Sequence, residues 1–231
     1  SLDINNTGAT NTGSITIGGN IGTDSAAGTG VLRLGNADTA GTITLGGAEY
    51  FTTGAQTYTA TAFTVSGTAP EFQATNQDIE FAAATGQDGD VTLGDASTIV
   101  VTGGSGAITF GGDILGTNGG EATDVTLNTT GTVGVKSIGA NGSTADNNIN
   151  DVTITGGTIN LNGTISTAVL GGSGDTASSD VGDVDINGAV NLSGHTIIDT
   201  SSSGGTVHFN STINGDKNLT IKSGAGTVTS A

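Results

Sequence analysis

The sequence predicts an all-β chain, folded as a single parallel β-helix (β-solenoid) of about seven to eight turns over residues 1–231, with open ends. Three observations lead to this prediction. An apolar–x–apolar unit recurs along the whole chain. Glycine and threonine, which favour turns and strands respectively, supply 42 residues each out of 231. No long segment carries apolar residues with the spacing of an amphipathic helix.

The strand unit is clearest in three glycine-flanked copies, at residues 13–19, 41–47 and 106–112. Successive side chains of a strand point to opposite sides, so the two apolar residues of each copy face the core and the residue between them faces outward. One such strand buries little, and many copies must therefore stack. Ten more units show the same alternation: Leu32/Leu34, Val91/Leu93, Val125/Leu127, Val133/Val135, Val152/Ile154, Ile159/Leu161, Val184/Ile186, Val190/Leu192, Val207/Phe209 and Leu219/Ile221.

The spacing of related units predicts turns of similar length. Four units begin with an aspartate, at Asp90, Asp124, Asp151 and Asp183, and these are 34, 27 and 32 residues apart. Each separation fits roughly one turn of a three-sided solenoid. The glycine-flanked copies start at residues 13, 41 and 106, which we interpret as one turn followed by two.

Taken in order, residues 1–47 are expected to form strands joined by polar loops. Residues 48–87 form an irregular section with Pro70, the single proline, and six of the eight aromatic residues. We interpret this section as a wider part of the core, with an aromatic sugar-binding face as the alternative. Residues 88–231 return to regular strands. Three polar loops that project from corners are expected near residues 116–123, 139–150 and 166–182.

Several segments resemble the repeats of large bacterial adhesins of the filamentous-haemagglutinin, strand-repeat type. The segments are GAQTY at residues 54–58, ITFGGDILGT at 108–117, GTVHFNSTING at 205–215 and LTIKSG at 219–224. The resemblance implies a right-handed β-helix in a secreted or surface-anchored bacterial fibre. It also implies an adhesin that acts in a filament or biofilm, either as an internal length of a longer chain or as a subunit.

The charge of the chain limits its partners. The formal net charge is −17, and Arg33 is the one basic residue before Lys136. Binding to nucleic acid or to an anionic membrane needs clustered lysine and arginine, so neither partner is expected. The sequence has no cysteine and no long apolar run, which argues against disulfides and against membrane insertion.

Two pairs of aspartates are the candidate metal ligands, Asp88 with Asp90 and Asp183 with Asp185. Residues two apart in an extended strand point to the same side. With turn carbonyls, each pair could hold calcium, although calcium takes six to eight oxygen ligands. The same residues could equally be solvated charges at a strand edge. No other cofactor is expected.

The sequence offers no catalytic residues. The two histidines, His195 and His208, have no neighbouring motif that would make either a base or a metal ligand. Polysaccharide lyases and hydrolases gather acid–base residues on one face, whereas the acidic, basic and histidine residues of this chain are dispersed. The basic residues are scattered along the chain as Arg33, Lys136, Lys217 and Lys222.

Outward threonines raise the possibility of ice binding, which needs a flat and regular array. The varying turn length argues against such an array, as do the residues that share the middle position: Arg33, Asn160, Asp185, Asn191 and His208. We therefore expect a structural or adhesive segment of a bacterial extracellular fibre, not an enzyme. Its partners would be further copies, flanking repeats, or cell-surface or matrix polysaccharide. A carbohydrate- or ice-binding module is the alternative.

Overall fold

The computed structural model describes residues 1–5, 13–22, 30–38, 41–94, 99–116, 123–139, 149–167 and 181–231. Within these residues the chain is all-β, as the sequence predicts, with strands β1 to β23 and no helix. No helix of the described chain is therefore available to cross a membrane. The three expected loops near 116–123, 139–150 and 166–182 lie largely outside the described residues.

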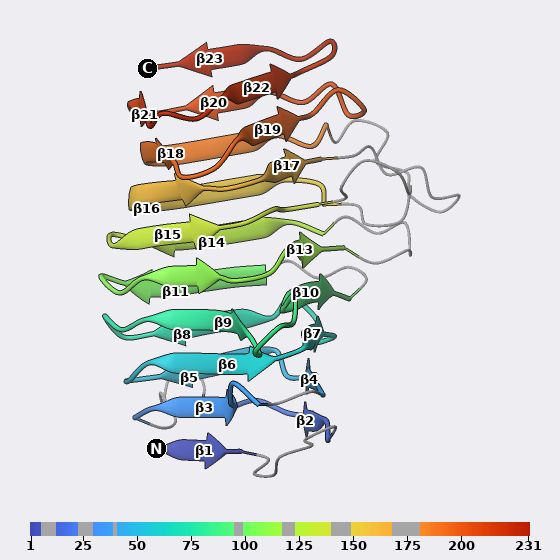
Figure 1. The fold of residues 1–231 in the computed structure, drawn as a ribbon, viewed down its shortest axis with the longest axis vertical. Coiled ribbons are helices and arrows are strands. Elements are labelled where there is room, and N and C mark those ends of the chain that lie inside the picture. The colour runs from blue at the N-terminus through green and yellow to red at the C-terminus, as the bar shows by residue number, and fades with distance from the viewer. Residues whose placement is uncertain are drawn as a thin grey trace.

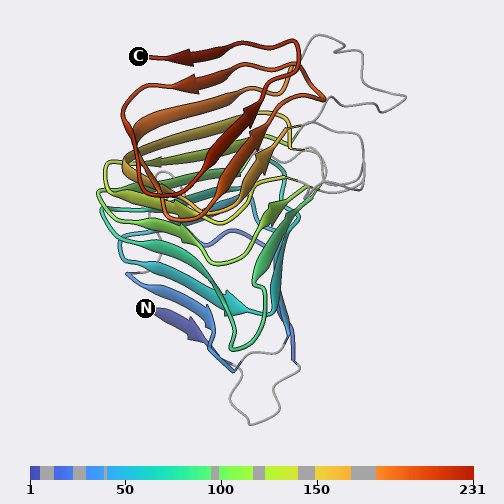
Figure 2. The ribbon, with the colours of Figure 1, turned by 45° about the horizontal axis from the view of Figure 1, so that its top comes forward.

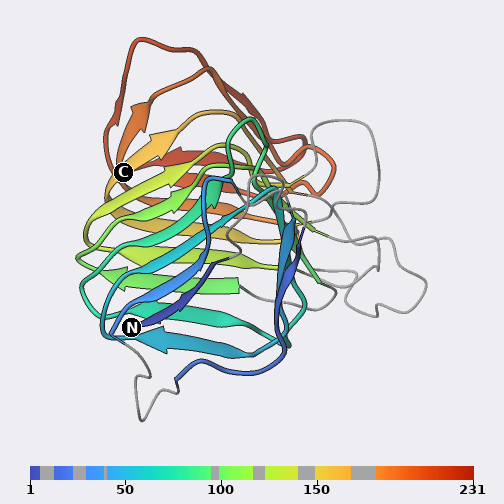
Figure 3. The same ribbon diagram turned by 60° about the horizontal axis from the view of Figure 1, so that its bottom comes forward.

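The strands stack in layers and are paired only in parallel wherever the structure describes them. Figure 1 shows the stack running from β1 to β23, with the two termini at opposite ends. Figures 2 and 3 show that the strands curl around a common interior. The architecture is thus solenoid-like, with strands on three faces.

Face 1 contains β1 (Leu2–Ile4), β3 (Leu32–Gly35), β6 (Gln56–Ala60), β9 (Ile79–Ala83), β12 (Ile108–Phe110), β15 (Thr132–Val135), the second halves of β16 (Val152–Leu161) and β18 (Val184–Leu192), and β21 (Ile213–Asn214). Face 2 contains β2 (Ile15–Ile17), β4 (Thr42–Leu45), β7 (Ala62–Val65), β10 (Asp90–Leu93), β13 (Ile114–Leu115), β17 (Thr164–Ser166), β19 (Thr196–Asp199) and β22 (Leu219–Lys222). Face 3 contains β5 (Glu49–Thr52), β8 (Glu71–Ala74), β11 (Ile99–Gly104), β14 (Val125–Thr129), the first halves of β16 and β18, β20 (Val207–Phe209) and β23 (Val228–Ser230).

Two long strands, β16 and β18, pass from face 3 to face 1 without a break. Their pairing shifts register between Thr155 and Thr158, which marks the corner. Glycine is required there, because a Cβ on Gly188 would overlap the carbonyl oxygen of Gly156 in the layer below. The glycine-rich corners of the sequence therefore allow neighbouring layers to approach closely.

The inward and outward assignments of the strand units are confirmed. Ile108 and Ile154 have no solvent exposure, and the residues beside them, such as Thr109, face outward. The buried residues form one continuous core from the first layers to β20. The period-two alternation of the sequence was sufficient to predict which residues are buried, because inward side chains pack against the inward side chains of the next layer.

The layers vary in length more than the sequence pattern suggests. Paired residues are 20 positions apart between Ile43 and Phe63, and 33 apart between Ile165 and Ile198. The aspartate-led unit at Asp90 lies on face 2, whereas the other three precede strands of face 3. The separation of 34 residues is therefore not one turn, and that prediction was wrong.

The glycine-flanked units also divide between faces. Residues 13–19 and 41–47 contain β2 and β4 of face 2, but residues 106–112 contain β12 of face 1. The interpretation of 65 residues as two turns of one face was therefore wrong. Strands of all three faces need two inward apolar residues and a glycine-rich corner. The face of a strand therefore cannot be predicted from this motif.

The irregular section at residues 48–87 contributes its aromatic side chains to the core, as the first interpretation predicted. The ring of Tyr58 stacks on Phe81 with a centroid separation of 4.7 Å, and Phe81 stacks on Phe110 at 4.9 Å. Tyr50 and Phe72 form a second stacked pair at 4.7 Å. All six aromatic side chains of this section are buried, so the alternative of an aromatic sugar-binding face was wrong.

The GAQTY segment places a polar cluster inside this core. The Nε2 of Gln56 donates to the carbonyl oxygens of Tyr50 and Gln73, at 2.6 and 2.8 Å, and lies 3.2 Å from the hydroxyl of Thr52. Its Oε1 accepts a hydrogen bond of 2.9 Å from the hydroxyl of Tyr58. Gln56 is completely buried and its amide is satisfied on both sides, as a buried amide must be.

Candidate functional site

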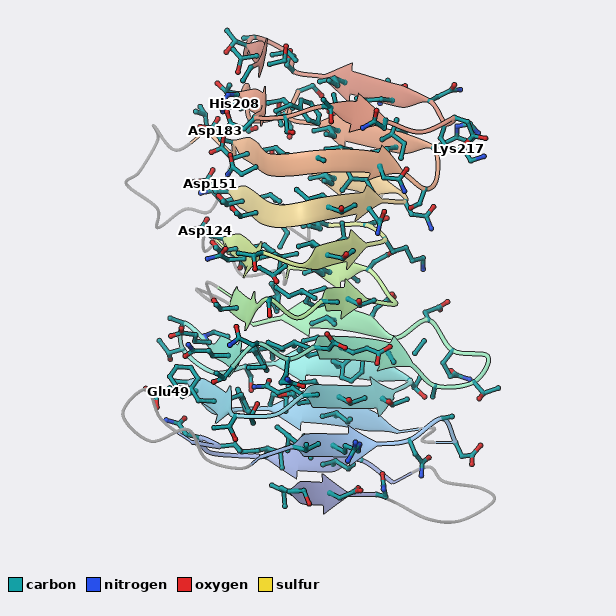
Figure 4. All side chains as sticks on the ribbon, turned by 90° about the vertical axis from the view of Figure 1, so that its left-hand side faces the viewer. Glu49, Asp124, Asp151, Asp183, His208 and Lys217 are labelled. Atoms are coloured by element: carbon teal, nitrogen blue, oxygen red, sulfur yellow. The ribbon has the colours of Figure 1, made fainter. Side chains whose placement is uncertain are left out.

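A column of aspartates at the corner before face 3 is a regular charged feature of the described residues. Figure 4 shows Asp124, Asp151 and Asp183 one above another in successive layers, with His208 above them. Each Oδ1 accepts a hydrogen bond from a backbone N–H of the next layer. The distances are 3.2 Å from Asp124 to Asp151, 2.8 Å from Asp151 to Asp183, and 2.6 Å from Asp183 to Thr206.

The column has a structural cause. At a corner the backbone turns away from the strand direction, and an N–H there needs an acceptor other than a strand carbonyl. The side chain of an aspartate that directly precedes the strand reaches the next layer, and its carboxylate supplies this acceptor. The same bond occurs elsewhere, from Ala107 to Asp78 at 2.8 Å and from Asp113 to Asp90 at 2.9 Å.

These contacts bear on the two predicted calcium pairs. Asp88 is exposed and precedes β10, and Gly89 between the two aspartates has a φ of 68°. Asp88 and Asp90 are therefore not two residues of one extended strand, and the reasoning from strand geometry was wrong for this pair. Asp90 Oδ1 already accepts the Asp113 N–H.

The second pair lies in a more regular segment. Asp183 supports the corner, while Asp185 Oδ1 lies 3.4 Å from Nδ1 of His208 in the next layer. The described residues contain no group of three or more histidine, cysteine or carboxylate side chains that could hold a metal ion. Calcium at Asp88 and Asp90, or at Asp183 and Asp185, stays a prediction that would need oxygen ligands from beyond these pairs.

The two histidines lie in different settings. His208 faces outward between the buried Val207 and Phe209, as the alternation predicts. His195 is exposed, and its Nδ1 accepts a hydrogen bond of 3.1 Å from the backbone N–H of Asn218 in the next layer. Both side chains thus contact an adjacent layer.

The lysines form ion pairs rather than a basic patch. Lys136 Nζ lies 3.5 Å from Asp113, Lys217 lies 3.0 Å from Asp216, and Lys222 lies 3.2 Å from Asp199. Desolvation raises the pKa of Asp199, but hydrogen bonds from Ser201 and the charge and hydrogen bond of Lys222 outweigh it, so this pKa is lowered. Each lysine in these pairs is exposed to solvent, and surface pairs of this kind are worth at most about 1 kcal/mol each.

Face 2 carries a column of outward threonines whose register was not predicted from the sequence. Thr16, Thr44, Thr64 and Thr92 occupy the same outward position in four successive layers, and Leu115 follows them. Five residues were expected to interrupt a threonine array, and all five lie on faces 1 and 3: Arg33, Asn160, Asp185, Asn191 and His208. That argument against a regular array therefore does not apply to face 2.

Asparagines form a second kind of outward ladder. Nδ2 of Asn191 donates to Oδ1 of Asn160 in the layer below, at 2.9 Å, and Asn210 donates to Asn187 in the same way. Stacked asparagines of this kind stabilise parallel strands in register. A signal was present in the sequence, because Asn160 and Asn191 hold the middle position of their strand units.

No protein-family model matches the chain, and neither the curated proteins nor the solved structures give a match. The resemblance to strand-repeat adhesins therefore stays a prediction.

Proposed function

We propose that this chain is a structural or adhesive segment of a bacterial extracellular fibre, secreted or held at the cell surface. The observation that supports the proposal best is the continuous parallel pairing from β1 to β23, with ladders of aspartate and asparagine beside the backbone ladder. A stack of this kind is suited to bearing load along its axis and to presenting the same surface many times.

In finer detail, we propose one right-handed β-helix of about seven to eight turns over residues 1–231. Parallel strands joined by a crossover are right-handed in nearly all proteins. Eight successive pairings on face 1 link Leu2 to Ile213, which supports this number of turns.

The mechanism would be multivalent and would not involve chemical turnover. A net charge of −17 keeps copies hydrated and apart at their sides. Individually weak contacts with cell-surface or matrix polysaccharide would add up when many copies act together. Further copies, or flanking repeats of a longer chain, would continue the stack along its axis.

Beads that carry many copies test this proposal against the free chain. We expect the beads to retain a panel of bacterial and host-surface polysaccharides at least about a hundredfold more strongly than single chains do, because linked sites rebind. Beads coated with heat-unfolded chain are the control. Equal retention by folded and unfolded coatings, or none on any surface, would contradict an adhesive role.

The threonine column supports one alternative, a face that binds ice or carbohydrate. Threonines in register on one parallel face present a series of hydroxyl and methyl groups. Replacing Thr64 by Lys should abolish thermal hysteresis or sugar binding if face 2 is the site. The same replacement at the exposed Thr109 on face 1 should have no effect, and an equal effect at both positions would exclude face 2.

A further inference from the structure

Face 1 is uncharged over four successive layers, in a chain whose net charge is −17. The layers are those of β12, β15 and the second halves of β16 and β18, and none of these strand segments contains an acidic or basic residue. Figure 1 shows β15, β16 and β18 one above another in the middle of the stack. The outward residues of these layers that we call the neutral patch are Thr109, Gly134, Asn160 and Asn191, in register, with Thr132 and Thr158 beside them.

The other two faces carry carboxylates on or beside their strands. The column of aspartates borders face 3, where Asp185 also faces outward. On face 2, Asp90 and Asp199 belong to β10 and β19. The charged residue closest in sequence to the neutral patch is Lys136, and its Nζ lies 3.5 Å from a carboxylate oxygen of Asp113. The neutral patch therefore differs in charge from the acidic surface of the other faces.

Gly134, at the centre of the neutral patch, is not required by the fold. A Cβ added there would meet no atom closer than the Thr109 side chain, at 3.9 Å, and the backbone φ of Gly134 is not positive. The pairing of β15 with β16 is regular along the whole of β15, so no bulge is present. The corner glycines differ, since a Cβ on Gly157 would overlap the carbonyl oxygen of Thr130.

A glycine inside a strand therefore needs another explanation at this position. It weakens the strand, because it loses more conformational freedom on folding and has no side chain to pack. Strands contain glycine at bulges, at tight bends, or where a ligand or another backbone approaches closely. The first two are absent at Gly134. Its half-exposed backbone lies between Thr109 and Asn160, which are two layer steps, about 9.5 Å, apart.

The side chains around Gly134 have the chemistry that sugar hydroxyls need. Each asparagine amide offers one carbonyl acceptor and two N–H donors. Nδ2 of Asn191 donates to Oδ1 of Asn160 at 2.9 Å, which orients both amides and leaves further donors and acceptors for a ligand. Orienting the groups before binding lowers the entropy lost on binding. Thr132 and Thr158 are exposed and add hydroxyl and methyl groups at the edge of the patch.

We propose that the neutral patch binds an uncharged polysaccharide, with one sugar ring over Gly134 and the glycan chain running from layer to layer along face 1. This proposal rests on the adhesive function proposed above and names its surface and its class of ligand. An acidic polysaccharide would be repelled by the net charge of −17. A protein partner would need aromatic or apolar anchors, which the patch does not offer. Each contact is weak, so retention depends on many copies.

Gly134→Val distinguishes a binding role from a structural one. Valine favours strands and restricts the unfolded chain, so stability in urea titration should stay equal or rise. Beads that carry Gly134→Val chains should retain a neutral glucan, mannan or galactan at least about tenfold less than wild-type beads, because the branched side chain occupies the place of the sugar ring. Thr153→Val, at an outward position of face 3, is the matched control and should retain as much as wild type.

A second pair of variants tests the amides. Asn160→Leu should lower retention by about fivefold or more, because the ligand loses hydrogen bonds to the amide. Asn128→Leu, at an exposed outward position of β14 on face 3, should leave retention unchanged. At low salt, wild-type beads should retain a polyuronic acid of the same length at least about tenfold less than the neutral glycans.

The outcomes separate this proposal from the adhesive function. Retention that survives Gly134→Val, or that falls equally in Thr153→Val, would overturn the neutral patch and leave the adhesive function in place. Equal retention of the polyuronic acid would overturn the class of ligand. Loss through Thr64→Lys alone would assign the site to face 2. No retention by wild-type beads would contradict both proposals. Self-association in sedimentation that Gly134→Val abolishes, with retention unchanged, would assign the patch to a second copy instead.

Discussion

Two sections of the stack achieve the same parallel pairing with different interiors. The aromatic section, residues 49–110, stacks rings between layers and buries the amide of Gln56 among them. The aliphatic section, residues 124–199, contains no phenylalanine or tyrosine. It carries instead the aspartate series from Asp124 to Asp183 and the asparagine pair Asn160 and Asn191.

The difference shows that the backbone ladder alone does not determine the core of this molecule. Aspartates also support single corners at Asp78 and Asp90, which accept the N–H groups of Ala107 and Asp113, but in the described residues neither supported residue passes the bond on to a further layer. In the aliphatic section each supported residue is the next aspartate, twice in succession. The aliphatic layers are therefore tied together at their corners, and the aromatic layers through their rings.

The largest expected effect is common to both sections. Ile108→Asp in the aromatic section and Ile154→Asp in the aliphatic section should each lower the free energy of unfolding by several kcal/mol, about 3–5, because a charge would be buried without a partner. Denaturant titration measures the change. Thr109→Asp, at an exposed position, should cost less than about 1 kcal/mol. Stability that is unchanged in either inward variant would reject the inward assignment.

The next effect is confined to the aromatic section. Gln56→Leu keeps the volume but leaves the Tyr58 hydroxyl and the carbonyl of Gln73 without their buried partner, so unfolding should become easier by about 2–4 kcal/mol. Thermal denaturation of this variant and of Thr57→Leu, an outward neighbour, provides the comparison. Similar melting of the two variants would show that the polar cluster is not required.

Alkaline pH should act on the aromatic section through its two buried tyrosines. Burial raises the pKa of Tyr58 well above its usual value, and the nearby Tyr50 raises it further; burial raises the pKa of Tyr50 too, although the Gly47 N–H opposes this. The folded pKa is thus higher than the unfolded one. The stabilisation is complete below about pH 10 and is lost as pH rises towards the folded pKa, by about 1.4 kcal/mol per pH unit for each tyrosine.

Urea titrations between pH 8 and 12 measure this loss. Tyr58→Phe should reduce the slope of stability against pH by about half, because one of the two buried phenols is then absent. An unchanged slope would mean that Tyr58 does not titrate on unfolding.

The smallest effect belongs to the aliphatic section. Asp151→Ala removes the acceptor of the Asp183 N–H and should lower stability by about 1–2 kcal/mol, as the loss of a hydrogen bond to a charged group does. Asp185→Ala, an outward aspartate on the neighbouring strand, is the matched control and should change stability by less than about 1 kcal/mol. Calorimetry that ranks the two the other way would contradict the role of the corner aspartates.

The inward residues could be predicted from the sequence because alternation is a local property. Val152 and Ile154 belong to the core whatever lies above or below them. The face of a strand is not a local property. Asp90 and Asp124 begin similar units but lie on different faces. The face depends on the number of corners between the two units, and that number is set by the residues between them, which are not part of the motif.

The candidate sites were less predictable for the same reason. The partners of Gln56 include Gln73, 17 residues away, and the threonine column joins residues that are 20 or 28 positions apart. Only knowledge of the register brings such residues together. The calcium pairs, by contrast, were chosen from sequence neighbours on the assumption that both aspartates lie in one extended strand. At Asp88 this assumption fails, because Gly89 has a left-handed backbone conformation.

The unequal length of the layers has an evolutionary consequence. The inward columns stay in register although the chain between partners ranges from 20 to 33 residues, so the surplus is accommodated between strands and not within them. Insertions and deletions at corners, which add little loop-closure entropy, would leave every core contact intact. A change in the length of a corner would therefore alter the surface of such a protein without altering its alternating strand units.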